Sequence, residues 1–231
     1  DYPKVLQVSS NVGMVRIMQN LPPKTYWDWL NKLGISKNLE TDLFESTAGQ
    51  LKSKDIFVNQ LIEPAVASFG KGFSISPLKL AQLHAVLANG GVEVIPHVTL
   101  NFKDHLLNNS QKEIFSSKVS RIVLEWMESV VDYGSGVGAK IEGYRIGGKT
   151  GTSQKAINGR YTSKKVCSFV ATFPINNPKY VVLVVIDEPS KEYAYGSTVA
   201  VPIAKEIIES LIVIEKIPPE IDKSRLIVKK P

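Results

Sequence analysis

The chain has 231 residues, of which 43% are apolar, 8% aromatic and 22% charged, and this composition excludes disorder, a collagen-like repeat and a disulfide scaffold. Its longest apolar run, Tyr180–Ile186, is far shorter than the ~20 residues of a membrane-spanning helix. The net charge of +6 comes without zinc-finger spacing, an aromatic RNA-binding signature or a recognition-helix pattern, so nucleic acid is not an expected partner.

Residues 1–139 show the three-to-four-residue apolar spacing of helices. Four helices are predicted from their start and stop signals. The first helix follows the cap Ser9-Ser10-Asn11, and the second follows Pro22-Pro23 and ends at Gly34. The third begins at the N-cap Ser76 before Pro77, and the fourth runs from about Ser117 to Asp132.

The pattern changes at the glycine-rich stretch Gly134–Gly138. Beyond it, β-branched and aromatic residues predict strands over Tyr144–Thr152, Val166–Phe173 and Tyr180–Ile186. Asn158-Gly159 is a hairpin dipeptide, and Asn176-Asn177-Pro178 is a turn signal, so the strands are expected to pair consecutively and antiparallel.

A final helix is predicted on the apolar positions between Ala200 and Leu211, where it would cover one face of the sheet. The predicted fold class is therefore α+β. Residues 1–139 form a mainly helical part, residues 140–216 form a sheet with its helix, and residues 217–231 form a tail.

Gly143–Thr150 matches the pattern G-x-x-x-x-G-K-[ST] of phosphate-binding loops. That motif needs a buried strand before its first glycine and a helix that opens at Lys-Thr. No apolar run precedes Gly143, and the residues after Thr150 are poor helix formers, so nucleotide binding is only a weak alternative.

The same residues suit a different chemistry, because a Lys-Thr-Gly sequence on an edge strand exposes an ammonium, a hydroxyl and an accessible backbone along one line. Lys149-Thr150-Gly151-Thr152 resembles the Lys-Thr-Gly box of serine penicillin-binding proteins and β-lactamases, and Ser9-Ser10-Asn11 resembles their Ser-x-Asn box.

The resemblance extends over nearly the whole chain and is strongest to class B penicillin-binding proteins, in particular the septal peptidoglycan D,D-transpeptidase. It is carried by several further segments: Gln7–Gly13, Ala67–Gly72, Ser76–Ala81, Gly143–Arg145 and Asn158–Tyr161. It implies the penicillin-binding-protein/β-lactamase-like fold. The chain would be the C-terminal portion of one transpeptidase domain, with three strands of the family's five-stranded antiparallel sheet.

In this family the nucleophile is the serine of a Ser-x-x-Lys sequence. The chain contains two such strings, Ser68 to Lys71 and Ser76 to Lys79. Both follow the Ser-x-Asn box, whereas the family's nucleophile precedes it. Gly70 and Gly72 disfavour a helix after Ser68, and Ser76 is better explained as a helix cap. The chain also begins at Asp1 without a signal peptide, so we expect a piece of a longer protein whose nucleophile and membrane anchor lie upstream.

The resemblance assigns a role to each remaining box residue. Ser9 would relay a proton to the leaving group, and Asn11 would hold the amide of the acyl donor. Lys149 would supply positive charge near the donor's terminal carboxylate, and Thr150 would donate its hydroxyl to it. Gly151, which has no side chain, would let the donor lie against the strand, and the backbone N–H of Thr152 would contribute to the oxyanion hole. Helix capping by Ser9-Ser10-Asn11 and a solubilising Lys149 are the alternative, purely structural interpretations.

Other titratable residues are expected to be structural. His84, His97 and His105 lack metal-ligand spacing, Cys167 is a small core residue, and Asp187 and Glu188 form a solvated strand end. No metal or organic cofactor is expected.

The resemblance implies acyl transfer from D-Ala-D-Ala stem peptides, with β-lactams as mimics of the donor. It also implies divisome membrane proteins as partners and a bacterial protein whose catalytic domain lies outside the cytoplasm. The chain alone would be inactive. A non-catalytic penicillin-binding-like sensor module is the main alternative. Because the family's first strand would be absent, the strand Tyr180–Ile186 is also expected to have an unprotected edge, free to pair with another chain or a tail segment such as Leu226–Val228.

Overall fold

The computed structural model describes residues 1–43, 47–99, 112–157 and 160–220. The fold divides into two compact units, Asp1–Arg121 and Ile122–Pro231. The boundary falls inside a helix, α8 (Ser117–Tyr133), rather than at the glycine-rich stretch where the sequence pattern changes. No helix of the described ranges is both long and apolar enough to cross a membrane.

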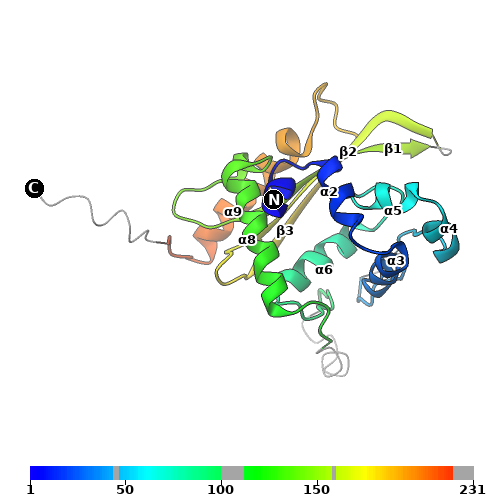
Figure 1. The fold of residues 1–231 in the computed structure, drawn as a ribbon. Helices are drawn as coiled ribbons and strands as arrows, with labels where there is room; N and C mark the ends of the chain where they lie inside the picture. The colour runs from blue at the N-terminus through cyan, green and yellow to red at the C-terminus, as the bar shows by residue number, and fades with distance from the viewer. Residues whose placement is uncertain (44–46, 100–111, 158–159, 221–231) are drawn as a thin grey trace, which may run out of the picture. The chain divides into compact units, whose positions relative to one another are not determined.

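The first unit is helical (Figure 1). Its helices are α1 (Tyr2–Gln7), α2 (Asn11–Met18), α3 (Pro23–Lys32), α4 (Lys54–Asn59), α5 (Ile62–Ala67) and α6 (Pro77–Ala88). Leu30, Phe57 and Ala67 form the centre of its core, and Tyr26 meets Phe57 edge to face with ring centroids 5.6 Å apart. The predicted helices α2, α3 and α6 are confirmed. The six-residue helices α1, α4 and α5 have no sequence prediction, because six residues span fewer than two helical turns and show too little apolar spacing.

The second unit is built on an antiparallel sheet in the order β1-β2-β3. The strands are β1 (Gly147–Ile157), β2 (Arg160–Phe173) and β3 (Tyr180–Asp187), which confirms the predicted consecutive pairing. The first hairpin is longer than predicted at its turn, because β1 runs on to Ile157 and β2 already begins at Arg160, its pairing partner. The dipeptide Asn158-Gly159 between them lies outside the described residues. At its other end, β1 begins at Gly147, three residues after the predicted start at Tyr144.

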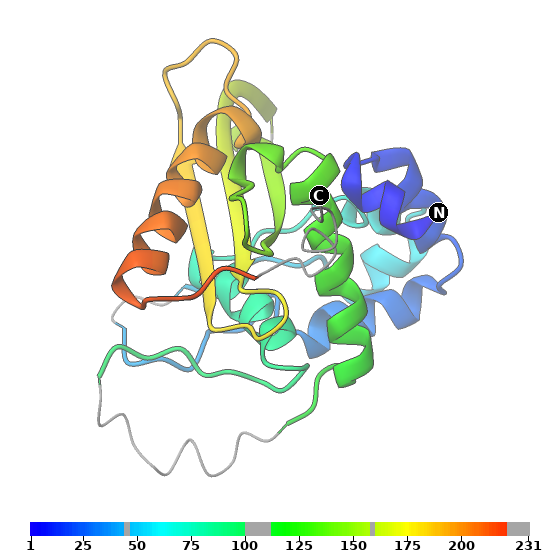
Figure 2. The same ribbon diagram turned by 90° about the vertical axis from the view of Figure 1, so that its left-hand side faces the viewer.

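Helix α9 (Val201–Ile214) packs on one face of this sheet, as the views in Figures 1 and 2 show. It continues the short π-helix η2 (Gly196–Ala200). Phe169, Phe173 and Ile208 are fully buried between the sheet and α9, where each contributes about 1.5–3 kcal/mol of hydrophobic free energy. The turn η1 (Val137–Ala139) completes this core through Ala139.

The segment after α9 contacts the residues that precede β1. Tyr144 Oη donates a hydrogen bond to Ile217 O at 3.0 Å, and Glu220 N donates to Gly143 O at 2.7 Å. The first residues of the predicted tail are therefore bound to the unit, while Leu226–Val228 lies outside the described residues.

In the described part of the chain, β3 pairs only with β2. Its residues Val182 and Val184 face the core, whereas Val185 is 37% exposed. That the outer edge of β3 is unprotected and pairs with another chain or a tail segment stays a prediction.

Candidate active site

The Lys149–Thr152 sequence lies in the middle of β1, an edge strand of the described sheet. Lys149 pairs with Val170 and Thr150 with Phe169, so the backbone of this segment is held by β2 on one side. Because side chains alternate along a strand, Lys149 and Gly151 lie on one face and Thr150 and Thr152 on the other. Lys149-Thr150 does not open a helix, and the phosphate-loop interpretation of Gly143–Thr150 is therefore wrong.

Lys149 is partly buried, and burial lowers the pKa of its ammonium below the ordinary value. Its Nζ donates a hydrogen bond to Thr150 O at 2.9 Å, within the same strand. A desolvated ammonium gains more from an anionic partner than one in bulk water does, because the effective dielectric constant is lower. Lys149 is therefore suited to bind a carboxylate.

The Thr150 hydroxyl contacts a residue that the sequence analysis missed. Ser135 Oγ lies 2.7 Å from Thr150 Oγ1, in the loop between α8 and η1. Its sequence signal is the serine inside Gly134–Gly138, a stretch whose glycines mark a change of pattern. This contact fixes the Thr150 side chain from outside its own strand.

Thr152 is held from a second distant segment. Gly196 N, at the start of η2, donates a hydrogen bond to Thr152 Oγ1 at 3.0 Å. A Cβ atom at Gly196 would lie 2.6 Å from Gly151 O, a distance that real Cβ atoms do not show, so only glycine allows this approach. The loop before α9 thus supports the second half of the Lys149–Thr152 sequence.

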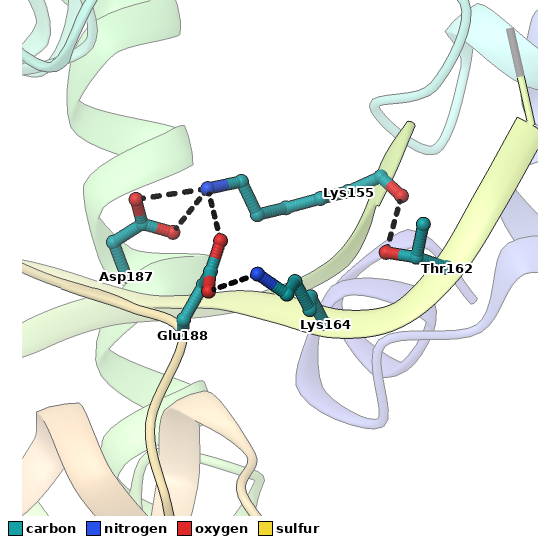
Figure 3. A network of polar contacts seen from close by, with 5 residues as sticks. All are labelled: Lys155, Thr162, Lys164, Asp187 and Glu188. Carbon is teal, nitrogen blue, oxygen red and sulfur yellow. Dashed lines mark hydrogen bonds and ion pairs between the residues drawn. The ribbon is translucent and has the colours of Figure 1, made fainter. Parts of the chain in front are cut away.

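The far end of β1 carries an ion-pair network, shown in Figure 3. Lys155 Nζ contacts both Asp187 oxygens at 3.0 Å and Glu188 Oε1 at 2.8 Å, and Lys164 Nζ contacts Glu188 Oε2 at 2.8 Å. The two lysines lower the pKa of Glu188 to about 2. Asp187 and Glu188 are exposed as predicted, but they are paired rather than simply solvated.

Ser9 and Asn11 lie in the first unit, around the junction of α1 and α2. Ser10 is the N-cap of α2, and its Oγ accepts a hydrogen bond from Gly13 N at 3.0 Å. Capping therefore accounts for Ser10 but not for Ser9 or Asn11, whose side chains are exposed. Ser9 has a φ of 53°, in the left-handed region that non-glycine residues seldom adopt. Such strain concentrates at functional sites.

A groove of about 360 Å³ begins at Asn11 within the same unit. Its wall combines apolar and polar side chains: Asn11, Val12, Val15, Arg16, Gln19 and Phe69. The first unit therefore offers a concave surface beside one of the predicted site residues. The roles assigned to Ser9, Asn11 and Lys149 require all three at one donor peptide, and because Lys149 belongs to the second unit this convergence is a prediction.

The two Ser-x-x-Lys strings have structural roles. Ser68 is the C-cap of α5, and its Oγ donates a hydrogen bond to Ala65 O at 2.7 Å. Ser76 is the N-cap of α6, and its Oγ accepts from Lys79 N at 3.2 Å. These contacts agree with the structural interpretation of both serines.

The histidines and the cysteine have structural surroundings, and Cys167 pairs with Thr152 across the β1–β2 ladder. Burial lowers the pKa of His84 to about 4, and Cys167 is fully buried in β2, with its pKa raised by desolvation. His97 Nδ1 contacts Ile95 O at 3.1 Å, and His105 lies outside the described residues. Within the described ranges, no three His, Cys, Asp or Glu side chains gather as metal ligands would.

Residues 1–209 match the family model described as the penicillin binding protein transpeptidase domain. Among curated proteins, the chain is 47% identical over 240 residues to the "Peptidoglycan D,D-transpeptidase FtsI homolog" of Mesostigma viride, covering 94% of this chain and 40% of that protein. It is 34% identical over 229 residues to the "Probable peptidoglycan D,D-transpeptidase PenA" of Neisseria gonorrhoeae, covering 98% of this chain and 38% of that protein. The chain thus spans less than half the length of these relatives.

Solved structures show the same fold. The apo transpeptidase domain of Burkholderia pseudomallei penicillin-binding protein 3 superposes with a TM-score of 0.84 at 29% identity, covering 95% of this chain and 66% of that one. Penicillin-binding protein 3 of Mycobacterium tuberculosis in complex with aztreonam superposes with a TM-score of 0.80 at 26% identity, covering 95% of this chain and 52% of that one. The predicted α+β transpeptidase fold is confirmed.

Proposed function

The chain belongs to the penicillin-binding protein transpeptidase domain family, and we propose that it is part of a peptidoglycan D,D-transpeptidase that cross-links the septal cell wall. The names of the curated relatives support this activity. The fold supports it through the position of Lys149-Thr150-Gly151-Thr152 on an edge strand.

In the proposed site, a D-Ala-D-Ala stem peptide lies along the outer edge of β1, where its terminal carboxylate is reached by Lys149 from one face of the strand and by Thr150 from the other. The partly desolvated Lys149 ammonium supplies the charge, and the Thr150 hydroxyl, positioned by Ser135, donates a hydrogen bond. Gly151 lets the peptide backbone lie along β1, and the backbone N–H of Thr152 stabilises the oxyanion of the tetrahedral intermediate.

The proposed reaction is a serine-type acyl transfer in two steps. A serine hydroxyl attacks the carbonyl of the D-Ala-D-Ala amide and loses its proton, an ester forms, and the amide C–N bond breaks. Ser9 passes a proton to the departing D-Ala nitrogen while Asn11 holds the donor amide. In the second step, the amine of a neighbouring stem attacks the ester, a new amide forms, and the serine regains its proton.

We propose that this nucleophilic serine is not among the residues of this chain. The hydroxyls of Ser68 and Ser76 are both engaged with the backbone, and neither serine precedes the Ser9–Asn11 box. The chain alone would then be inactive. In the complete protein, β-lactams would acylate the serine as mimics of the donor, in keeping with the aztreonam complex of the Mycobacterium tuberculosis relative.

The proposed partners of the complete protein are peptidoglycan stem peptides and divisome membrane proteins. We place its catalytic domain outside the cytoplasm, with an anchor in the membrane, because the stem peptides of the cell wall are found there.

The Lys149 ammonium on the edge strand is the observation that carries this proposal. Its test is the rate of acylation of the complete protein by a labelled penicillin. Lys149→Ala should lower the second-order acylation constant by about 10²–10³, the cost of losing one essential electrostatic contact. Lys179→Ala, a change of an exposed lysine elsewhere in the second unit, is the matched control.

Equal acylation of Lys149→Ala and the unchanged protein would contradict the assigned role of Lys149. A complete protein that is not acylated at all would instead favour a non-catalytic sensor module.

A further inference from the structure

A second concave surface lies in the first unit, at the end of α3 and beside α6. Its volume is about 220 Å³, and it shares no lining residue with the groove at Asn11. The chemistry proposed above does not use it.

The wall of this cavity is predominantly positive. It contains the four lysines Lys32, Lys37, Lys79 and Lys112, against the two glutamates Glu40 and Glu93, and the Lys32 ammonium lies over the Trp29 ring, 4.4 Å from its centroid. Lys112 Nζ lies 3.7 Å from Glu93 Oε2, at the long end of an ion pair. The lysines therefore exceed the carboxylates that could neutralise them within the wall.

Lys79 is the most constrained of these cations. Its Nζ donates a hydrogen bond to Gln82 Oε1 at 2.8 Å, and Gln82 Nε2 in turn donates to Val94 O at 2.7 Å. Gln82 is only 6% exposed, and the hydrogen bond to the Val94 carbonyl holds its amide in one orientation. The Lys79 ammonium is thereby positioned by a buried side chain rather than left to move on the surface.

The backbone makes room for this ammonium. Gly34 ends the turn after α3 with a φ of +70°, and a Cβ atom there would lie 3.0 Å from Lys79 Nζ. Burial lowers the pKa of Lys79, and the nearby charges of Lys112 and Lys37 lower it further, while Glu93 acts in the opposite direction. An anion in the cavity would offset both the lost hydration and the mutual repulsion of these lysines.

We propose that this cavity, built around Lys79 and Gln82 and lined by Lys32, Lys37 and Lys112, binds a compact dianion bearing carboxylate or phosphate oxygens. The lysines of the wall outnumber its glutamates by two, and this positive excess favours a ligand with more than one negative charge. Ammonium groups interact with both kinds of oxyanion as point charges, and the volume limits the ligand to a small molecule or a single charged group of a larger one.

The test is isothermal titration calorimetry of the complete protein with inorganic phosphate and, separately, with succinate, both at an ionic strength matched with chloride. At least one dianion should bind more tightly than chloride. Lys79→Met, which keeps the length of the side chain, should weaken that binding by about tenfold or more. Lys37→Gln changes an exposed lining residue, leaves the fold intact and should weaken it by about threefold.

Two further variants keep the readout specific. Lys24→Gln, at an exposed lysine outside the cavity, and Lys179→Ala, at an exposed lysine of the second unit, should both leave binding unchanged. Binding of phosphate alone or succinate alone would identify the class of oxyanion. The proposal is overturned if neither dianion binds more tightly than chloride, or if Lys79→Met and Lys37→Gln both bind as the unchanged protein does.

Discussion

Two lysines on the same strand have opposite electrostatic environments. Burial lowers the pKa of Lys149, whereas hydrogen bonds to Glu188 and Asp187 raise the pKa of Lys155. Lys155 stabilises the end of the hairpin, with its charge balanced within the protein. Lys149 donates to the backbone oxygen of Thr150, the residue whose hydroxyl Ser135 holds in place. At the scale of single residues, this contrast separates a structural lysine from one suited to a ligand.

The Ser135 contact predicts a measurable positioning effect. Ser135→Ala should lower the acylation rate of the complete protein by about three- to tenfold, the usual range for one lost hydrogen bond. The loss should fall mainly on the apparent affinity for the β-lactam, because Thr150 is proposed to bind the carboxylate. The measurement is the dependence of the acylation rate on β-lactam concentration.

Ser135→Thr restores a hydroxyl at this position and should recover most of the rate. If Ser135→Ala acylates as fast as the unchanged protein, the hydroxyl pair is only structural.

At the scale of the secondary-structure elements, the first hairpin is held at its far end by charges rather than by burial. Arg160, Tyr161 and Lys164 are exposed on β2, and the connection to the end of β3 runs through Lys155, Lys164 and Glu188. Because Lys164, Asp187 and Glu188 are exposed, salt should weaken the attraction between these charges.

The Glu188 carboxylate predicts a pH dependence of stability. Its pKa falls from 4.5 to about 2 on folding, so it stabilises the folded state above about pH 4.5 and loses this effect as the pH falls towards about 2. Glu188→Gln should therefore lower the thermal unfolding midpoint at pH 7, and the difference from the unchanged protein should shrink between these two pH values.

Glu192→Gln, in the exposed loop after β3, is the control for a general effect of charge. A deficit of Glu188→Gln that is as large near pH 2 as at pH 7 would show that the ion pairs are not its cause.

At the scale of the whole molecule, the chain carries two of the three sequence boxes assigned to the reaction. The Ser9–Asn11 box lies in the first unit and the Lys149–Thr152 box in the second, and the two Ser-x-x-Lys strings serve as helix caps. The site as proposed is therefore incomplete within these 231 residues.

This incompleteness predicts that the 231-residue chain alone forms no covalent adduct with penicillin. The measurement is the mass of the denatured chain after incubation with a labelled β-lactam, with the complete protein as the positive control. One label per chain would contradict the prediction and return Ser68 and Ser76 to consideration as nucleophiles.

The sequence by itself determined the elements whose signals are local. The helices that start at Pro23 and Pro77, the long helix α8 and the consecutive strands follow from apolar spacing, capping residues and turn dipeptides, which act over a few positions. The Lys149-Thr150-Gly151-Thr152 box was recognisable for the same reason, since its residues are adjacent on one strand.

Only the tertiary structure decided the contacts between distant positions. The six-residue helices α4 and α5 pack on each other and on α3 and bury Phe57, Pro64 and Ala67, and helices this short depend on such packing. The links from Ser135 to Thr150 and from Gly196 to Thr152 join residues that are 15 and 44 positions apart. Such links depend on where the chain returns in space, because hydrogen bonds form only at a few ångströms and the sequence does not record that distance.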